Sequence, residues 1–413
     1  MGSMRVAVGG LGMLCAAAAV VLLRGAVAAA DPYDGLSVYH TPYYELHTDL
    51  DRPDALEAVI RMTRMVEEYH HRTRDFSGAL PQPLPFYLFR TQGEYLAAGG
   101  PSGSCGVFTG KALLAAGGSH AGGWTWHVIQ HEGFHQFAHA VIGGEIPTWL
   151  NEGMAEYFGY GVFTGDSIVT GVIPEAKFKQ VLQDMERSPD SGGFVPIRQL
   201  MLMSHRQWNE QMSAVNYDQA WSMVQFLAHA ENGRYQSVLV GMMQELKNGG
   251  DWEHGYLSEF GSAGGFENCW RKYWQGLPDH PTDLLYAQAS VSAITSFVGR
   301  CDEADQKFDN FWRFAQAAEE GGLRIPNDDW LPPSVLQSAM DDANDRMSQG
   351  AKFSLSETSS GRQQVVCLLA DRTQLLGTYQ IHHGHVVHVT VDIVRPNAGE
   401  RKRLPRLLEP GSN

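Results

Sequence analysis

The sequence predicts an α+β protein in which a small N-terminal β/α region and a mainly helical part are followed by a smaller α+β unit. Three observations support this. The chain has 413 residues, 43% of them hydrophobic and 19% charged, which suits a folded protein with more than one core. Strand-like alternation occurs near the N-terminus, and helical spacing dominates residues 124–247. Several short strand-like segments return after residue 353.

The net charge narrows the class of partner. With 31 Lys and Arg against 46 Asp and Glu, the formal charge is −15. Nucleic acid and anionic membrane surfaces repel so acidic a chain, so neither is expected as its main partner. A folded enzyme or a binding protein remains, and its oligomeric state is open.

Residues 1–30 read as a secretory signal peptide. Arg5 precedes an apolar run from Val6 to Leu23, and the segment ends in small residues suited to cleavage after Ala28 or Ala30. The alternative is an uncleaved membrane anchor, because the run is just long enough to span a bilayer. Cleavage predicts a secreted, periplasmic or cell-envelope protein with no integral membrane span.

The elements that follow are read from their periodicity. Residues 43–48 and 86–89 are expected as strands around a helix at 52–74, and 107–116 as a third strand or a hairpin. Paired glycines then mark a turn before a helix at 124–142. Further helices are expected at 148–160, 174–187, 217–231 and 235–247.

A change of composition near residue 280 predicts a domain boundary. Residues 31–280 would form the first domain, 281–395 a C-terminal α+β domain of unknown role, and 396–413 a disordered tail. Within the second domain, 287–320 reads as helical, 327–333 as a connector, 334–347 as a helix and 353–394 as several short strands.

The residues most informative about chemistry are His131-Glu132-Gly133-Phe134-His135, a His-Glu-x-x-His motif. On a helix, His131 and His135 project from one face and can share a metal ion. Glu132 then points to where an activated water would lie. The motif therefore predicts a metal site with an adjacent general base.

A catalytic zinc site needs a third protein ligand and an open position for water. A downstream histidine of the metzincin type is absent, because Ala138 and Val141 occupy the positions of that pattern. The other candidate is Glu152 in Trp149-Leu150-Asn151-Glu152-Gly153, with sixteen residues between it and His135.

The two motifs together resemble the gluzincin metallopeptidases of the MA clan, especially the M1 group and uncharacterised secreted bacterial zincin families. The resemblance is close over residues 127–160 and implies a zincin-like catalytic domain with Glu152 as the third ligand of one zinc per chain. The Gly-x-Met-Glu-Asn motif that binds a substrate's free amine in aminopeptidases does not precede the helix. Endopeptidase action on peptides or proteins is therefore expected, and a catalytically silent envelope-binding or scaffold protein is the alternative.

The resemblance also implies roles for two further residues. Glu156, one turn beyond Glu152, would orient a ligating histidine, or it is a solvated helix residue. Tyr217 would stabilise the oxyanion, or it is a buried aromatic residue at a helix start. His205 is a weaker candidate for the same duty.

Other histidines and the cysteines admit simpler interpretations. His127 and His139 extend the helical stripe of the motif and are expected in packing or in orienting a ligand. Four more histidines lie on an expected hairpin around Gly384, and we interpret them as solvated strand residues and not as a second metal site: His382, His383, His385 and His388.

Four cysteines follow the signal peptide, and either disulfides or buried free thiols are compatible with their spacing: Cys105, Cys269, Cys301 and Cys367.

Overall fold

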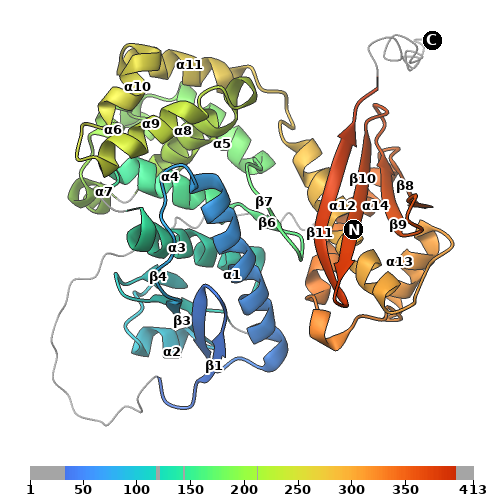
Figure 1. Ribbon diagram of the computed structural model, residues 1–413. Coiled ribbons are helices and arrows are strands. Elements are labelled where there is room, and N and C mark those ends of the chain that lie inside the picture. The colour runs from blue at the N-terminus through green and yellow to red at the C-terminus, as the bar shows by residue number, and fades with distance from the viewer. Residues whose placement is uncertain (1–32, 118–120, 143–144, 212, 397–413) are drawn as a thin grey trace, which may run out of the picture. The chain divides into compact units, whose positions relative to one another are not determined.

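The computed structural model describes residues 33–396 except 118–120, 143–144 and 212, and it is a mixed α+β structure (Figure 1). The chain separates into two compact units. One contains residues 1–161 and 170–282, and the other contains residues 162–169 and 283–413. The expected signal peptide lies outside the described residues, as does the expected tail beyond Pro396.

A five-stranded sheet begins the first unit, in the order β1-β2-β3-β5-β4. The strands are β1 (Ser37–His40), β2 (Tyr44–Thr48), β3 (Leu84–Phe89), β4 (Gly106–Phe108) and β5 (Leu113–Ala116). The central three run parallel, while β1 and β4 lie antiparallel at the two edges. The segment 107–116 therefore forms a hairpin, and β4 is an edge strand.

Two helices accompany the sheet. Helix α1 (Arg52–Thr73) crosses from β2 to β3, as a parallel pair requires, and buries Met62 and Tyr69. Helix α2 (Gln92–Ala97) begins at a capping box made by Thr91 and Glu94. Its Tyr95 joins β3 and β5 in a buried cluster with Phe89 and Leu114.

Helix α3 (Gly123–Val141) lies between this sheet and a group of further helices (Figure 1). These are α4 (Thr148–Gly159), α5 (Glu175–Glu186), α6 (Ile197–Met201), α7 (His205–Gln211), α8 (Ala214–Gly233), α9 (Gln236–Lys247), α10 (Glu253–Phe260) and α11 (Ala263–Gln275). Helix α8 is central, because every residue from 216 to 227 is buried. The indoles of Trp270 and Trp274 donate to Ser222 at 3.2 and 3.1 Å and fasten α11 to it.

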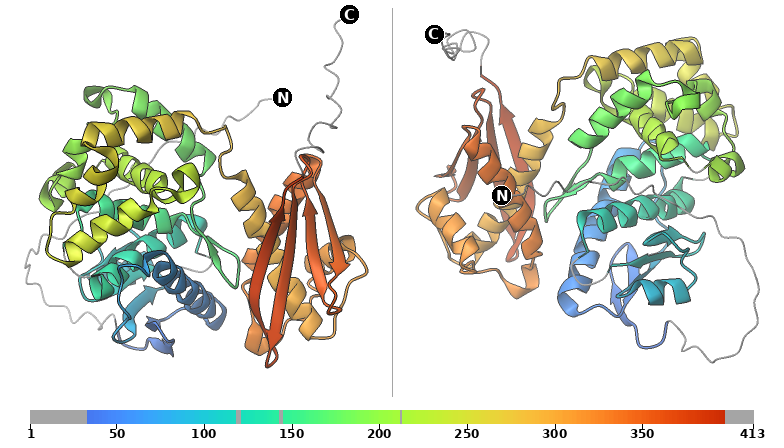
Figure 2. Two further views of the ribbon diagram at one scale, coloured as in Figure 1. Left: turned by 45° about the horizontal axis from the view of Figure 1, so that its top comes forward. Right: turned by 180° about the vertical axis from the view of Figure 1, so that it is seen from behind.

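The second unit combines helices with a four-stranded antiparallel meander (Figure 2). Its elements are β6 (Val162–Phe163), β7 (Ile168–Val169), α12 (Asp283–Glu303), α13 (Phe311–Glu319), α14 (Pro333–Ser348), β8 (Lys352–Glu357), β9 (Gln363–Leu368), β10 (Gln374–His382) and β11 (His385–Val394). Helix α12 packs on the meander so closely that a Cβ at Gly377 would lie 1.9 Å from Thr295 Oγ1. Only glycine fits at that point of β10.

The segment 287–320, predicted as helical throughout, is two helices. Helix α12 ends at Glu303, where Asp305 adopts φ +55° and the Gln306 N–H donates to the Cys301 carbonyl at 2.8 Å. Aspartate tolerates this left-handed backbone better than most residues. Asn310 then caps α13 by accepting from the Arg313 N–H at 3.0 Å. Between Glu303 and Asn310 the sequence has no glycine or proline that would mark the break.

The β6–β7 hairpin belongs to the second unit although it lies between α4 and α5 in sequence. The buried Arg300 guanidinium holds it, donating to both carboxylate oxygens of Asp166 at 2.8 and 2.9 Å. The same side chain donates to Asp329 Oδ1 at 2.8 Å. This charge is fully paired, which its burial requires.

Two simpler findings complete the fold. Within the described ranges, no helix is both long and apolar enough to cross a membrane. The four described cysteines are unpaired, so of the two interpretations of their spacing the structure has free thiols. Burial raises the pKa of Cys301 to about 12 and that of Cys367 to about 11.

Candidate metal centre

Helix α3 carries the His-Glu-x-x-His motif in a fixed position. Its apolar residues are distributed all round the helix, which is typical of a buried helix. The Phe134 and Phe137 rings pack on Tyr69 of α1 at centroid distances of 5.6 and 5.3 Å. Gly133 allows this approach, because a Cβ there would lie 2.8 Å from Met62 Cε. The face opposite α1 therefore presents His131 and His135 in a defined orientation.

Helix α4 brings the second motif to the same place. It packs between α3 and α8, and its Gly153 lets α8 approach so closely that a Cβ would lie 2.6 Å from the Ala220 carbonyl oxygen. Glu152 and Glu156, one turn apart, then face α3. Both carboxylates are buried, with 9% and 2% of each residue exposed.

Three side-chain atoms of the predicted ligands converge. His131 Nε2 and His135 Nε2 lie 3.1 Å apart, and each lies 3.4 Å from Glu152 Oε2. Two imidazoles and a carboxylate are donors that one cation can share, and these residues form one of two such groups among the described residues. The structure therefore brings together all three residues predicted as ligands.

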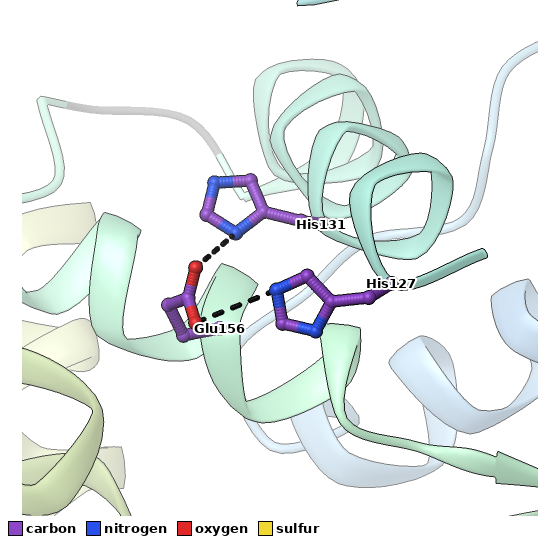
Figure 3. Close-up of side chains that lie close together, drawn as sticks. All are labelled: His127, His131 and Glu156. Carbon is purple, nitrogen blue, oxygen red and sulfur yellow. Dashed lines mark ion pairs between the residues drawn. The ribbon is translucent and has the colours of Figure 1, made fainter. Parts of the chain in front are cut away.

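Glu156 lies behind this group and contacts two histidines. Its Oε1 lies 3.2 Å from His131 Nδ1, and its Oε2 lies 3.5 Å from His127 Nε2 (Figure 3). His127, His131 and Glu156 form the second group that could hold a cation, and all three are buried. Glu156 is thus placed where an orienting carboxylate should be and is not a solvated helix residue.

The charges of the centre influence one another strongly. Burial opposes ionisation of Glu152, but the imidazoles of His135 and His131 outweigh it and lower the pKa of this carboxyl to about 2. Burial likewise opposes ionisation of Glu156, and His127 and His131 hold its pKa well below the usual range. Burial opposes protonation of His131, but the carboxylates of Glu152, Glu156 and Glu132 outweigh it and hold its pKa well above the ordinary value. The charged carboxylates and imidazoles of this buried centre therefore compensate one another.

Glu132 is held by a contact that the sequence did not reveal. Its Oε2 accepts a hydrogen bond from the Phe108 backbone N–H at 2.8 Å. Phe108 ends the edge strand β4, which packs on α3. The side chain is 9% exposed and faces the cavity described next. The hydrogen bond fixes one carboxylate oxygen and thereby the direction of the group.

A cavity of about 550 Å³ opens onto the centre. His131, Glu132, His135 and Glu152 line it together with Val107, Phe108 and Thr109 of β4 and its following loop. It is large enough for a short stretch of peptide. A molecule bound in this cavity would therefore contact both the predicted metal ligands and Glu132.

Tyr217 and His205, the two candidates for stabilising an oxyanion, both line this cavity. Tyr217 is the fourth residue of α8 and not its first, is 7% exposed, and lies with its ring 6.3 Å from the ring of His131. His205 starts α7, is exposed and contacts Asn209 at 3.1 Å. Of the two, Tyr217 is the more firmly placed.

The remaining histidines take different positions. His139 also lines the cavity and lies with its ring 5.5 Å from that of Phe108. The C-terminal cluster occupies the β10–β11 hairpin as predicted, and the rings of His382 and His383 lie 4.1 Å apart. Over the part of the chain that the structure describes, this cluster offers no three converging ligand atoms.

Comparison with known proteins adds one similarity. Residues 126–245 match the family described as "Protein of unknown function (DUF1570)". No curated protein matches the chain. The matched segment runs from α3 into α9 and contains both motifs, Glu156 and Tyr217. The similarity to this family therefore covers the whole candidate metal centre.

Proposed function

We propose that this protein is a secreted zinc-dependent metallopeptidase of the gluzincin type. The observation that carries the proposal is the convergence of His131 Nε2, His135 Nε2 and Glu152 Oε2 at 3.1 to 3.4 Å. Atoms bound to zinc at about 2.0–2.1 Å in a tetrahedron lie about 3.4 Å apart. The spacing of the three atoms thus suits zinc, and the cavity leaves the fourth position accessible.

Each residue then has a chemical role. Zinc, when bound, polarises the scissile carbonyl and makes water more acidic. Glu132 takes a proton from the attacking water while the oxygen bonds to the carbonyl carbon. The same carboxyl delivers that proton to the amine nitrogen as the carbon–nitrogen bond breaks. The Phe108 N–H keeps Glu132 directed at the cavity, and the Tyr217 hydroxyl donates to the developing oxyanion.

The walls of the cavity favour cleavage inside a peptide. Among the described residues that line it there is no Lys or Arg to bind a terminal carboxylate. The acidic residues among these described lining residues are Glu132 and Glu152, which belong to the centre itself. We therefore favour an endopeptidase.

Metal analysis tests the proposal. The purified protein should contain about one zinc per chain, and His131→Ala or Glu152→Ala should abolish it because each removes one of three ligands. His71→Ala and Glu175→Ala, both on exposed helix positions, are the matched controls and should keep the metal. Wild-type protein that takes up no zinc, or ligand variants that retain it, would refute the proposal.

A further inference from the structure

For His127, a buried histidine one turn before the motif, the sequence left two roles open, packing or orienting a ligand. His127 lies on the same stripe of α3 as His131, and the two rings both face Glu156 of α4 (Figure 3). Only 5% of the surface of His127 is exposed to solvent. Among the described side chains, neither ring nitrogen has a hydrogen-bond partner of good geometry, and the Glu156 carboxylate is the charged group beside it.

The geometry distinguishes an orienting arrangement from a second metal site. In the proposed zinc site, the single atom Glu152 Oε2 lies 3.4 Å from both imidazole nitrogens. Glu156 instead presents a different oxygen to each ring, at 3.2 Å to His131 and 3.5 Å to His127. The His127 and His131 rings are also farther apart, with centroids at 6.3 Å against 4.8 Å for His131 and His135. The second carboxylate bridges two rings and does not share one point with them.

We infer that His127 is a positioning residue, which acts on the proposed zinc site through Glu156. A metal ligand must be a neutral imidazole, and a carboxylate only accepts hydrogen bonds, so in a metal-bound His131 the proton is on Nδ1, the nitrogen that faces Glu156. The lone pair of His131 is then on Nε2, beside Glu152 and His135. By holding the far oxygen of Glu156, His127 keeps the near oxygen on His131 and so fixes the ligand form of that ring.

His127 is itself held on three sides. The Trp124 indole stacks on its ring at a centroid distance of 4.9 Å and an interplanar angle of 9°. The Tyr160 ring lies 4.4 Å away. Gly159, the last residue of α4, lies so close that a Cβ there would come within 2.8 Å of His127 Cε1. Because these contacts fix the orientation of the His127 ring, the ring can in turn fix the position of the Glu156 carboxylate.

Two substitutions at this position separate orientation from packing. His127→Leu fills the space without a polar atom, whereas His127→Gln keeps an amide donor near the position of Nε2. We expect His127→Leu to weaken zinc binding about tenfold, at the lower end of the effect typical for orienting partners, and to lower kcat more than KM. His127→Gln should recover most of the zinc affinity.

The measurements are zinc affinity by competition with a chromogenic chelator, zinc stoichiometry, and thermal unfolding of the metal-free proteins as a check on folding. Gly159→Ala is a second perturbation, which should also weaken zinc binding because it displaces the His127 ring without changing its chemistry. Equal zinc affinities for wild type and His127→Leu would overturn the inference, as would equal losses in the Leu and Gln variants. Two zinc ions per chain, one of them lost in His127→Leu, would also overturn it by showing a second metal site.

The inference rests on the proposed function, and the two fail in different ways. If wild-type protein binds no zinc, the proposed function fails and the inference with it. If wild-type protein binds one zinc and the His127 variants match it, only the inference fails.

Discussion

The close packing of α4 on α8 makes Gly153→Ala a test of what positions Glu152. The added Cβ would lie 2.6 Å from the Ala220 carbonyl oxygen and 2.8 Å from Val224 Cγ2, where ordinary contacts begin at 3.4 Å. Both helices must therefore separate by several tenths of an ångström. Overpacking of this kind costs about 1–3 kcal/mol, against a gain of about 1 kcal/mol from replacing glycine in a helix. We expect a net loss of about 1 kcal/mol in the free energy of unfolding.

The same shift should weaken zinc binding, because metal–ligand distances tolerate only about 0.2 Å of change and Glu152 precedes the substituted residue. Urea denaturation of the metal-free protein and chelator competition for zinc measure the two effects. Gly241→Ala in α9 is the matched control, since the nearest atom to its Cβ would be 3.8 Å away. It should be neutral or stabilising and leave zinc affinity unchanged. If Gly153→Ala behaves like Gly241→Ala in both assays, the packing argument is wrong.

Three further predictions concern catalysis and stability. Tyr217→Phe should lower kcat about 10²-fold with zinc content unchanged, because it removes one oxyanion donor; an unaltered kcat would exclude that role. N-acetylated and free peptides of one sequence should be cleaved at similar rates, and cleavage of the free form alone would indicate an aminopeptidase. Burial, and secondarily the charge of Arg72, lower the pKa of His229 to about 4. Because the unfolded chain takes up this proton near pH 6.5, stability should fall as the pH drops below that value, by about 2 kcal/mol at pH 5. Equal slopes of unfolding free energy against pH for wild type and His229→Gln would contradict this.

Helix α3 and helix α4 could be predicted from the sequence because strong local patterns specify them. The two histidines four residues apart fix their own relative position once α3 is helical. The approach of Glu152 could be expected only from the resemblance to gluzincins, since nothing local relates the rotation of α4 to that of α3. The pairing of His127 with Glu156 also depends on the rotation of α4. The sequence therefore predicts that His127 lies on the same face of α3 as His131, but it does not predict that Glu156 is its partner.

Other features depend on contacts between segments far apart in sequence. The hydrogen bond from Phe108 to Glu132 requires the register of the β4–β5 hairpin, and a strand of three residues is too short to show alternation. The β6–β7 hairpin reads as a loop inside the first domain. Its membership in the second unit comes from the pairing of Asp166 with Arg300, 134 residues later. Such long-range pairs leave no periodic signal.

The central claim is that Glu132 performs acid–base chemistry beside a zinc ion that other residues hold. The most direct measurement is hydrolysis of an internally quenched peptide library by zinc-loaded wild type and Glu132→Gln, with zinc content determined on the same preparations. The amide is nearly isosteric and cannot take up the proton of water, so a loss of about 10²- to 10⁴-fold in rate is expected. Zinc content should stay at about one per chain. Full turnover by Glu132→Gln, or no turnover by the zinc-loaded wild type, would contradict the proposed mechanism.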